Sequence, residues 1–226
     1  MWRRGISADN GVALVIVLMA VLLLVALGVM LVLNTLTEVM VAGRYGVAQE
    51  TFYAADAVAE RGMDELANNL DWNSVLLGAQ QSGFVDGQGP GARTLSDGST
   101  IDLTNATNLL NCGHAAACTP AEMDAQTADR PWGSDNPRWI LYGYGPLAGM
   151  VSGHTVNSNT YVGLWVADDP SETDHDPLSD SNDALALHAE AFGPGEVHRI
   201  VEVNIGRAES LHPESGIRLI AWREVR

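Results

Sequence analysis

The chain has 226 residues and a formal net charge of −16 at neutral pH, with 28 acidic and 12 basic side chains. Such an acidic surface argues against negatively charged partners, namely nucleic acid and anionic lipid, and is compatible with a cation-binding or extracellular protein. The hydropathy of the whole chain is balanced only because a very apolar amino end is averaged with a polar remainder.

The amino end contains one uninterrupted apolar run, Val12–Leu33, without charge or proline. A membrane-spanning helix needs about 20 apolar residues, whereas the apolar core of a cleaved secretory signal has about 7–15. Polar sequence follows from Asn34 with no glycine or proline to stop a helix, so we expect a membrane helix that continues beyond the membrane. Arg3 and Arg4 are the only positive charges before the run, which predicts a single pass through the inner membrane with a cytoplasmic amino end.

The junction in front of this run carries a family resemblance. A short basic leader ends in Gly11, directly against the apolar helix. This resembles the class III signal of type IV pilins and pseudopilins, which prepilin peptidase cuts after the glycine. The resemblance implies that residues 1–11 are a leader peptide and that Val12 becomes a methylated amino terminus. The alternative is an uncleaved signal anchor, and Gly5 is a second candidate that lies farther from the apolar run.

One position departs from the pattern of that family. Most pilins carry glutamate at the fifth mature position, which is Ile16 here when counting starts at Val12. In the family this glutamate is paired with the amino terminus of a neighbouring subunit, and an isoleucine cannot make that pair. Minor pilins of the PilX type and the K-type pseudopilin are also unusual at this position. The departure therefore favours a minor subunit, at the filament tip for example, over a major one.

Residues 34–70 carry apolar side chains at spacings of three, four and seven, which is typical of an amphipathic helix. One face is made of Phe52, Ala55, Ala59, Met63, Leu66 and Leu70. The spacing predicts one long helix, with residues 12–33 in the membrane and residues 34–70 as its amphipathic half. Gly43 and Gly46 each weaken the helix by about 1 kcal/mol relative to alanine, so they mark a candidate bend or a locally melted patch.

Within this half the resemblance becomes more specific. The segment Thr37–Arg44 (TEVMVAGR), followed by Ala48–Ala57 (AQETFYAADA), is similar to the amino-terminal domain family of PilX. Several non-apolar positions agree in order, and the similarity covers residues 5–70. Periodicity by itself indicates only an amphipathic helix, so the family assignment comes from the resemblance.

Residues 71–226 are expected to form a separate β-rich domain outside the membrane. Short strand-like segments alternate with turn signals, and they are Thr100–Leu103, Trp139–Tyr144, Thr160–Val166, Leu185–Phe192, Val197–Ile205 and Ile217–Trp222. The turn Gly193–Glu196 joins two of them into a hairpin, in which we expect His188 and His198 to face each other. The predicted fold is therefore α+β, a long amino-terminal helix packed on a carboxy-terminal antiparallel β-sheet.

The two cysteines, Cys112 and Cys118, enclose the five residues GHAAA. In an exported domain such a close pair can form a disulfide that closes a small loop. Free thiols are the second interpretation. A zinc site with His114 and His154 is the third, although the spacing fits no standard pattern.

The segment 167–184 is rich in acid and lies between two predicted strands. Calcium binds six to eight oxygen ligands, which clustered aspartates can supply. The candidate ligands are Asp168, Asp169, Asp174, Asp176, Asp180 and Asp183. The glycine and closing glutamate of an EF-hand loop are absent, so a solvated acidic loop is the alternative to a calcium site.

The resemblance implies a minor type IV pilin, a non-enzymatic subunit that enters or primes a pilus through its amino-terminal helix. Its partners would be prepilin peptidase, the inner membrane and the other major and minor pilins, and its final location the pilus on the cell surface. A K-like tip pseudopilin of type II secretion and a signal-anchored, calcium-binding periplasmic module are the alternatives. The sequence has no glycine-rich phosphate loop, nucleophile elbow or catalytic carboxylate pair, so we do not expect an enzyme.

Overall fold

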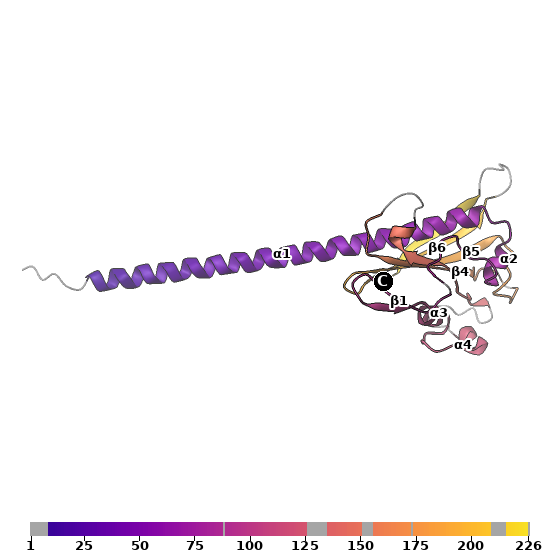
Figure 1. The fold of residues 1–226 in the computed structure, drawn as a ribbon, viewed down its shortest axis with the longest axis horizontal. Helices are drawn as coiled ribbons and strands as arrows, with labels where there is room; N and C mark the ends of the chain where they lie inside the picture. The colour runs from indigo at the N-terminus through magenta and orange to yellow at the C-terminus, as the bar shows by residue number, and fades with distance from the viewer. Residues whose placement is uncertain are drawn as a thin grey trace, which may run out of the picture. The chain divides into compact units, whose positions relative to one another are not determined.

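The computed structural model describes residues 9–87, 89–125, 135–150, 156–172, 174–208 and 216–225, with side chains described from Val12 onward. The chain divides into two compact units, Met1–Gly46 and Val47–Arg226. Figure 1 shows the helices and strands with the labels used below.

The first helix, α1, extends over Asp9–Ala67 and therefore has residues in both units. Gly43 and Gly46 are both helical, so the helix is not melted at these positions; a single helical glycine is tolerated because its penalty is only about 1 kcal/mol. The helix ends at Ala67 and not at the predicted Leu70, which is 90% exposed. Asparagine competes with helical backbone bonding, and the side chain of Asn69 accepts a hydrogen bond from the amide of Asp71 at 2.9 Å.

The second unit is built on a five-stranded antiparallel sheet in the order β3-β4-β5-β6-β7. Its strands are β3 (Ile140–Pro146), β4 (Tyr161–Asp168), β5 (Ala184–Gly193), β6 (Val197–Arg207) and β7 (Ile217–Val225). Each coincides with a predicted segment to within two or three residues. Together with the long apolar helix, this sheet confirms the predicted α+β fold.

The sixth predicted segment corresponds to β2 (Thr100–Asp102), which pairs with β1 (Ala92–Thr94) in a separate two-stranded sheet. Four short helices complete the described part of this unit. They are α2 (Trp72–Leu76), α3 (Leu103–Cys112), α4 (Pro120–Ala125) and the 3-10 helix η2 (Leu147–Gly149).

The β5–β6 hairpin forms as predicted, but its register differs from our expectation. Gly195 and Glu196 in the connecting turn have φ angles of 69° and 62°, a conformation that tight hairpin turns require. This turn places His188 opposite Glu202, and Phe192 opposite His198. The predicted cross-strand pair of His188 with His198 is therefore wrong.

Small residues let α1 approach one face of the sheet closely. Ala55 and Ala59 are fully buried in the core that α1 shares with β4, β5 and β6. A Cβ atom on Gly62 would lie 2.3 Å from the side chain of Leu164, and one on Gly193 would lie 2.2 Å from Oγ1 of Thr51. The amphipathic face predicted for this part of α1 is thus the face that packs on the sheet.

A second core covers the other face of the sheet. Trp139, Tyr144 and Trp165 are buried there together with Leu103 of α3. Figure 1 shows α3 and β1 on the side of the sheet away from α1. The second unit therefore has three layers, with the sheet between α1 and the α3 layer.

Candidate functional site

The apolar part of α1 is the largest exposed hydrophobic surface of the described chain. Every side chain from Val12 to Gly46 is exposed, including Leu24 and Leu31. The helix is long and apolar enough to cross a membrane, which makes it a candidate membrane anchor. Gly11 and Val12 lie within α1, near its first residue, and Ile16 is exposed one turn later; residues 1–8 of the expected leader lie outside the described residues.

Three carboxylates converge at the end of β4. One oxygen from each of Asp168, Asp169 and Glu172 lies within 4.8 Å of the others. Asp168 is the last residue of β4, and its backbone is therefore held by pairing with Leu185 of β5. Asp168 and Asp169 are only 4% and 7% exposed. Like charges this close, and this far from water, repel each other unless a proton or a cation lies between them.

The neighbouring loop supplies donors to two of these carboxylates. Asp169 accepts hydrogen bonds from the amide of Ser171 at 3.0 Å and from the side-chain amide of Asn182 at 2.8 Å. Glu172 accepts from the amide and the hydroxyl of Ser181. Oδ1 of Asp168, in contrast, is buried and has no hydrogen-bond partner among the residues that the structure describes.

The electrostatics of the cluster follow from this burial. Burial raises the pKa of Asp168 to about 9, and a hydrogen bond to Glu172 and the negative charges of Glu172, Asp180 and Asp169 act in the same direction. Burial also raises the pKa of Asp180, with the charges of Asp183 and Glu172 adding to the shift and the amide of Ala184 opposing it. Without a cation, Asp168 therefore holds a proton at neutral pH.

Of the six candidate calcium ligands, the structure brings Asp168 and Asp169 into this cluster. Asp180 is half-buried and close enough to influence Asp168, while Asp183 pairs with Arg207 at 3.1 Å. Asp174 and Asp176 are exposed and accept hydrogen bonds from backbone amides two residues later. Glu172, the third member of the cluster, was not among the predicted ligands.

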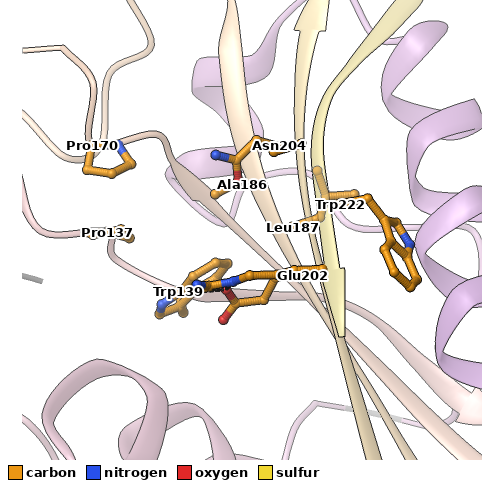
Figure 2. A pocket seen from close by; sticks show the side chains of 10 residues that line it. Pro137, Trp139, Pro170, Ala186, Leu187, Glu202, Asn204 and Trp222 are labelled. Carbon is orange, nitrogen blue, oxygen red and sulfur yellow. Dashed lines mark hydrogen bonds and ion pairs between the residues drawn. The ribbon is translucent and has the colours of Figure 1, made fainter. Parts of the chain in front are cut away.

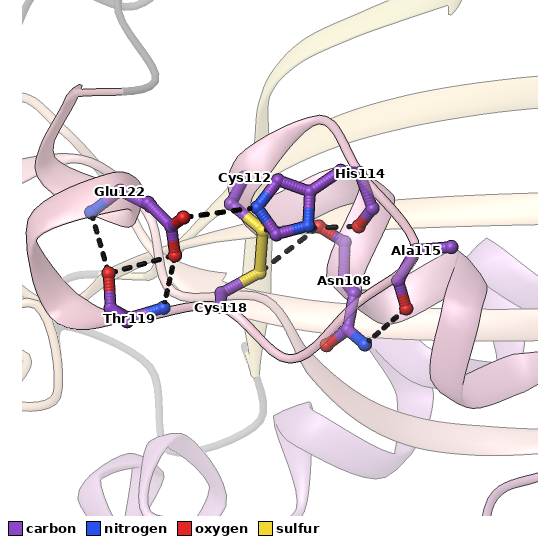
Figure 3. Close-up of polar contacts among 7 residues, drawn as sticks. All are labelled: Asn108, Cys112, His114, Ala115, Cys118, Thr119 and Glu122. Carbon is purple, nitrogen blue, oxygen red and sulfur yellow. Dashed lines mark hydrogen bonds and ion pairs between the residues drawn. A yellow bond between two sulfur atoms is a disulfide. The ribbon is translucent and has the colours of Figure 1, made fainter.

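Cys112 and Cys118 form a disulfide, so neither thiol is free to bind zinc. Figure 3 shows the bond at the end of α3, with His114 and Glu122 beside it. Nε2 of His114 lies 3.4 Å from Glu122, whose other carboxylate oxygen accepts the amide of Thr119 at 2.7 Å. His154, the other predicted zinc ligand, lies outside the described residues. The two cysteines therefore have a structural role, because their disulfide links the end of α3 to the residues just before α4.

Removing this cross-link is expected to destabilise the second unit modestly. The sequence separation of the cysteines is 6, and chain-entropy arguments give about 2 kcal/mol for so short a loop. The double variant Cys112→Ala/Cys118→Ala should therefore lower the free energy of unfolding by about 2 kcal/mol in urea titrations. Dithiothreitol should reproduce the loss in the wild type and have no effect on the variant; an unchanged wild type under reduction contradicts the assignment.

A cavity of about 370 Å³ lies over β5, β6 and β7 (Figure 2). Figure 2 shows Pro137, Pro170 and Trp139 towards the left of the view, Glu202 near the middle and Trp222 at the right. Among the described residues that line it there is no serine, threonine, cysteine or lysine, and its one carboxylate, Glu202, lies 3.0 Å from Nδ1 of His188. The prediction that the chain is not an enzyme stays a prediction.

Beside this cavity, β5 and β6 bury a network of charged side chains. His188 is 3% exposed and lies between Glu190, 2.9 Å from its Nε2, and Glu202, 3.0 Å from its Nδ1. His198 reaches the other oxygen of Glu190 at 3.0 Å, and Arg223 of β7 binds Glu202. The network links three strands and is fully paired, as buried charges must be.

Comparison with known proteins adds no relative: no family model, no curated protein and no solved structure matches the chain.

Proposed function

We propose that the chain is a minor subunit of a type IV pilus, processed by prepilin peptidase and assembled through α1 without any enzymatic activity. The observation that carries the proposal is the composition of α1. Its exposed apolar residues, from Val12 to Leu33, are suited to lipid or to the helices of other pilins. Its last residues, up to Ala67, pack on an antiparallel sheet. A helix with these two halves is the plan implied by the resemblance to pilins.

Ile16 supports the choice of a minor subunit. A glutamate at this position of an apolar helix would place a charge in lipid, which is costly without a partner. The exposed isoleucine carries no such penalty and requires no partner. A subunit that starts or ends a filament has a neighbour on one side only, so it does not need the charge pair expected between major subunits.

The mass of the amino-terminal peptide, taken from membranes and from sheared surface filaments, tests the proposal directly. A methylated Val12 at the amino terminus supports a prepilin peptidase substrate. An intact leader in both fractions contradicts it and favours a signal-anchored module. If Val12 is methylated but the protein copurifies with a secretion system and not with pili, the K-like pseudopilin is correct and the pilus assignment is wrong.

A further inference from the structure

We propose that Asp168, Asp169 and Glu172 bind a calcium ion that fastens the β4–β5 loop to the sheet. The proposal concerns the second unit alone and does not depend on the role of α1. It rests on two independent observations, the convergence of three carboxylates within 4.8 Å and the unpartnered Oδ1 of the buried Asp168.

The position of Asp168 is the stronger of these observations. Asp168 is only 4% exposed. A buried hydrogen-bond acceptor that lacks a donor costs free energy. Ordinary loop acids avoid this cost by facing water, as Asp174 and Asp176 do. The pairing of Asp168 with Leu185 fixes the face of the sheet on which its side chain lies. A cation in contact with Oδ1 would satisfy this oxygen, which no donor of the described residues reaches.

The charges around the cluster fit a bound cation. Among the described residues, no arginine or histidine forms an ion pair with Asp168, Asp169 or Glu172. The nearby Arg207 is engaged elsewhere, with Asp183 at 3.1 Å and with its guanidinium 4.0 Å above the ring of Trp72. The charge of these carboxylates is therefore left for a proton or a cation to compensate.

The donor set selects calcium among the common divalent ions. All three side chains offer oxygen, and zinc prefers nitrogen and sulfur ligands. Magnesium keeps several waters in a strict octahedron, whereas calcium accepts irregular sets of six to eight oxygens. The burial of Asp168 and Asp169 leaves little space for a water-rich shell. Backbone carbonyls, second carboxylate oxygens and water would complete the calcium shell.

The surrounding hydrogen bonds show what the ion would stabilise. Asn182 and Ser181 bind Asp169 and Glu172, and the amide of Asp180 donates to the side chain of Asn73 in α2 at 2.7 Å. These contacts connect the end of β4 to the residues just before β5. A cation that fixes the carboxylates therefore orders the whole connection, and its loss should release it.

The test uses the full chain in detergent micelles, first stripped with a chelator and then titrated with calcium chloride in a calorimeter. We expect binding at one site per chain. At a hundredfold excess over the dissociation constant, the melting temperature should rise by about 5–10 °C. Equal ionic strength from sodium chloride, and the same concentration of magnesium chloride, should produce at most a small part of this rise.

Three variants locate the site. Asp168→Asn removes one ligand charge at constant size, and it should weaken calcium binding more than about tenfold without lowering the melting temperature of the stripped protein. Glu172→Gln, at a less buried position, should show the same loss if Asp168→Asn fails to fold. Asp174→Asn is the matched control in the same loop and should respond to calcium like the wild type.

A wild type that shows neither binding heat nor a melting shift overturns the proposal, and a shared proton then satisfies the cluster. The proposal is also overturned if Asp174→Asn abolishes the calcium response while Asp168→Asn and Glu172→Gln keep it. If sodium chloride reproduces the whole rise in melting temperature, charge screening explains that rise and the proposal is again overturned.

Discussion

The variant Gly11→Ala is expected to remain uncleaved and to be absent from surface filaments. The proposed class III signal places the scissile bond between Gly11 and Val12, and the resemblance implies that the peptidase requires glycine before that bond. The effect should be close to all-or-none, because an unprocessed subunit keeps a charged leader in front of the helix that docks with other subunits. Mass spectrometry of the membrane fraction should then show residues 1–11 still attached.

Gly5→Ala is the matched control for this experiment. It makes the same chemical change in the same leader, but away from the junction with the apolar run. Processing and filament entry should be as in the wild type. Normal maturation of Gly11→Ala would falsify the class III assignment, and a block caused only by Gly5→Ala would move the cleavage site to that residue.

The strands of the second unit were predictable because period-two alternation and turn residues are local signals. The predicted segments Leu185–Phe192 and Val197–Ile205 differ from β5 and β6 only at their ends. The register was not predictable by the same reasoning. It depends on the conformation of the turn, where Glu196 adopts a positive φ, and a different turn would shift every pair, including His188 with Glu202.

The short helices were missed although one of them had a readable signal. Asp102 caps α3 by accepting the amides of Thr104 and Asn105 at 2.9 and 3.0 Å, and Gly113 ends the helix in a left-handed conformation. An aspartate and a glycine at this separation are typical helix boundaries. The end of α1 had a similar signal in the two asparagines after Ala67.

The carboxylate cluster was predicted only in part, for a physical reason. The sequence identifies an acid-rich loop, but a loop has no regular period from which to predict which of its side chains converge. Asp168 and Asp169 enter the cluster because β4 ends beside β5 and buries them. Glu172 joins them through its hydrogen bonds with Ser181, a contact across nine positions that composition does not reveal.

Replacing the buried histidine, His188→Leu, is expected to lower the free energy of unfolding by about 3 kcal/mol at neutral pH. Removing one partner of a buried charge pair is strongly destabilising. Here Glu190 and Glu202 both lose their bond to the buried imidazole and keep only His198 and Arg223, whose side chains are 42% and 68% exposed. The melting temperature should fall by about 6–12 °C.

His198→Leu is the matched control. It also removes a histidine from Glu190, but the side chain of His198 is 42% exposed, so the free energy of unfolding should change by less than about 1 kcal/mol. Equal losses in the two variants would contradict this account of the network.

The same network predicts how stability depends on pH. Burial opposes protonation of His188, but the hydrogen bonds and charges of Glu190 and Glu202 outweigh it and raise the pKa above its ordinary value of 6.5. Burial likewise opposes ionisation of Glu190, and the bonds to His188 and His198 outweigh it, lowering that pKa from 4.5 to about 2. A raised histidine pKa contributes stability that is complete below 6.5 and is lost as pH rises through the folded value. A lowered glutamate pKa contributes stability that is complete above 4.5 and is lost as pH falls towards 2.

The network should therefore stabilise the second unit most between pH 4.5 and 6.5 and progressively less at higher pH. His188→Gln isolates the histidine contribution, because the amide keeps a donor for Glu190 but does not titrate. Urea unfolding of the full chain in detergent, repeated across this range, should show a decline on the alkaline side in the wild type. The curve of His188→Gln should lack the part of that decline due to His188, and parallel curves for the two proteins would mean that His188 carries no proton in the folded state.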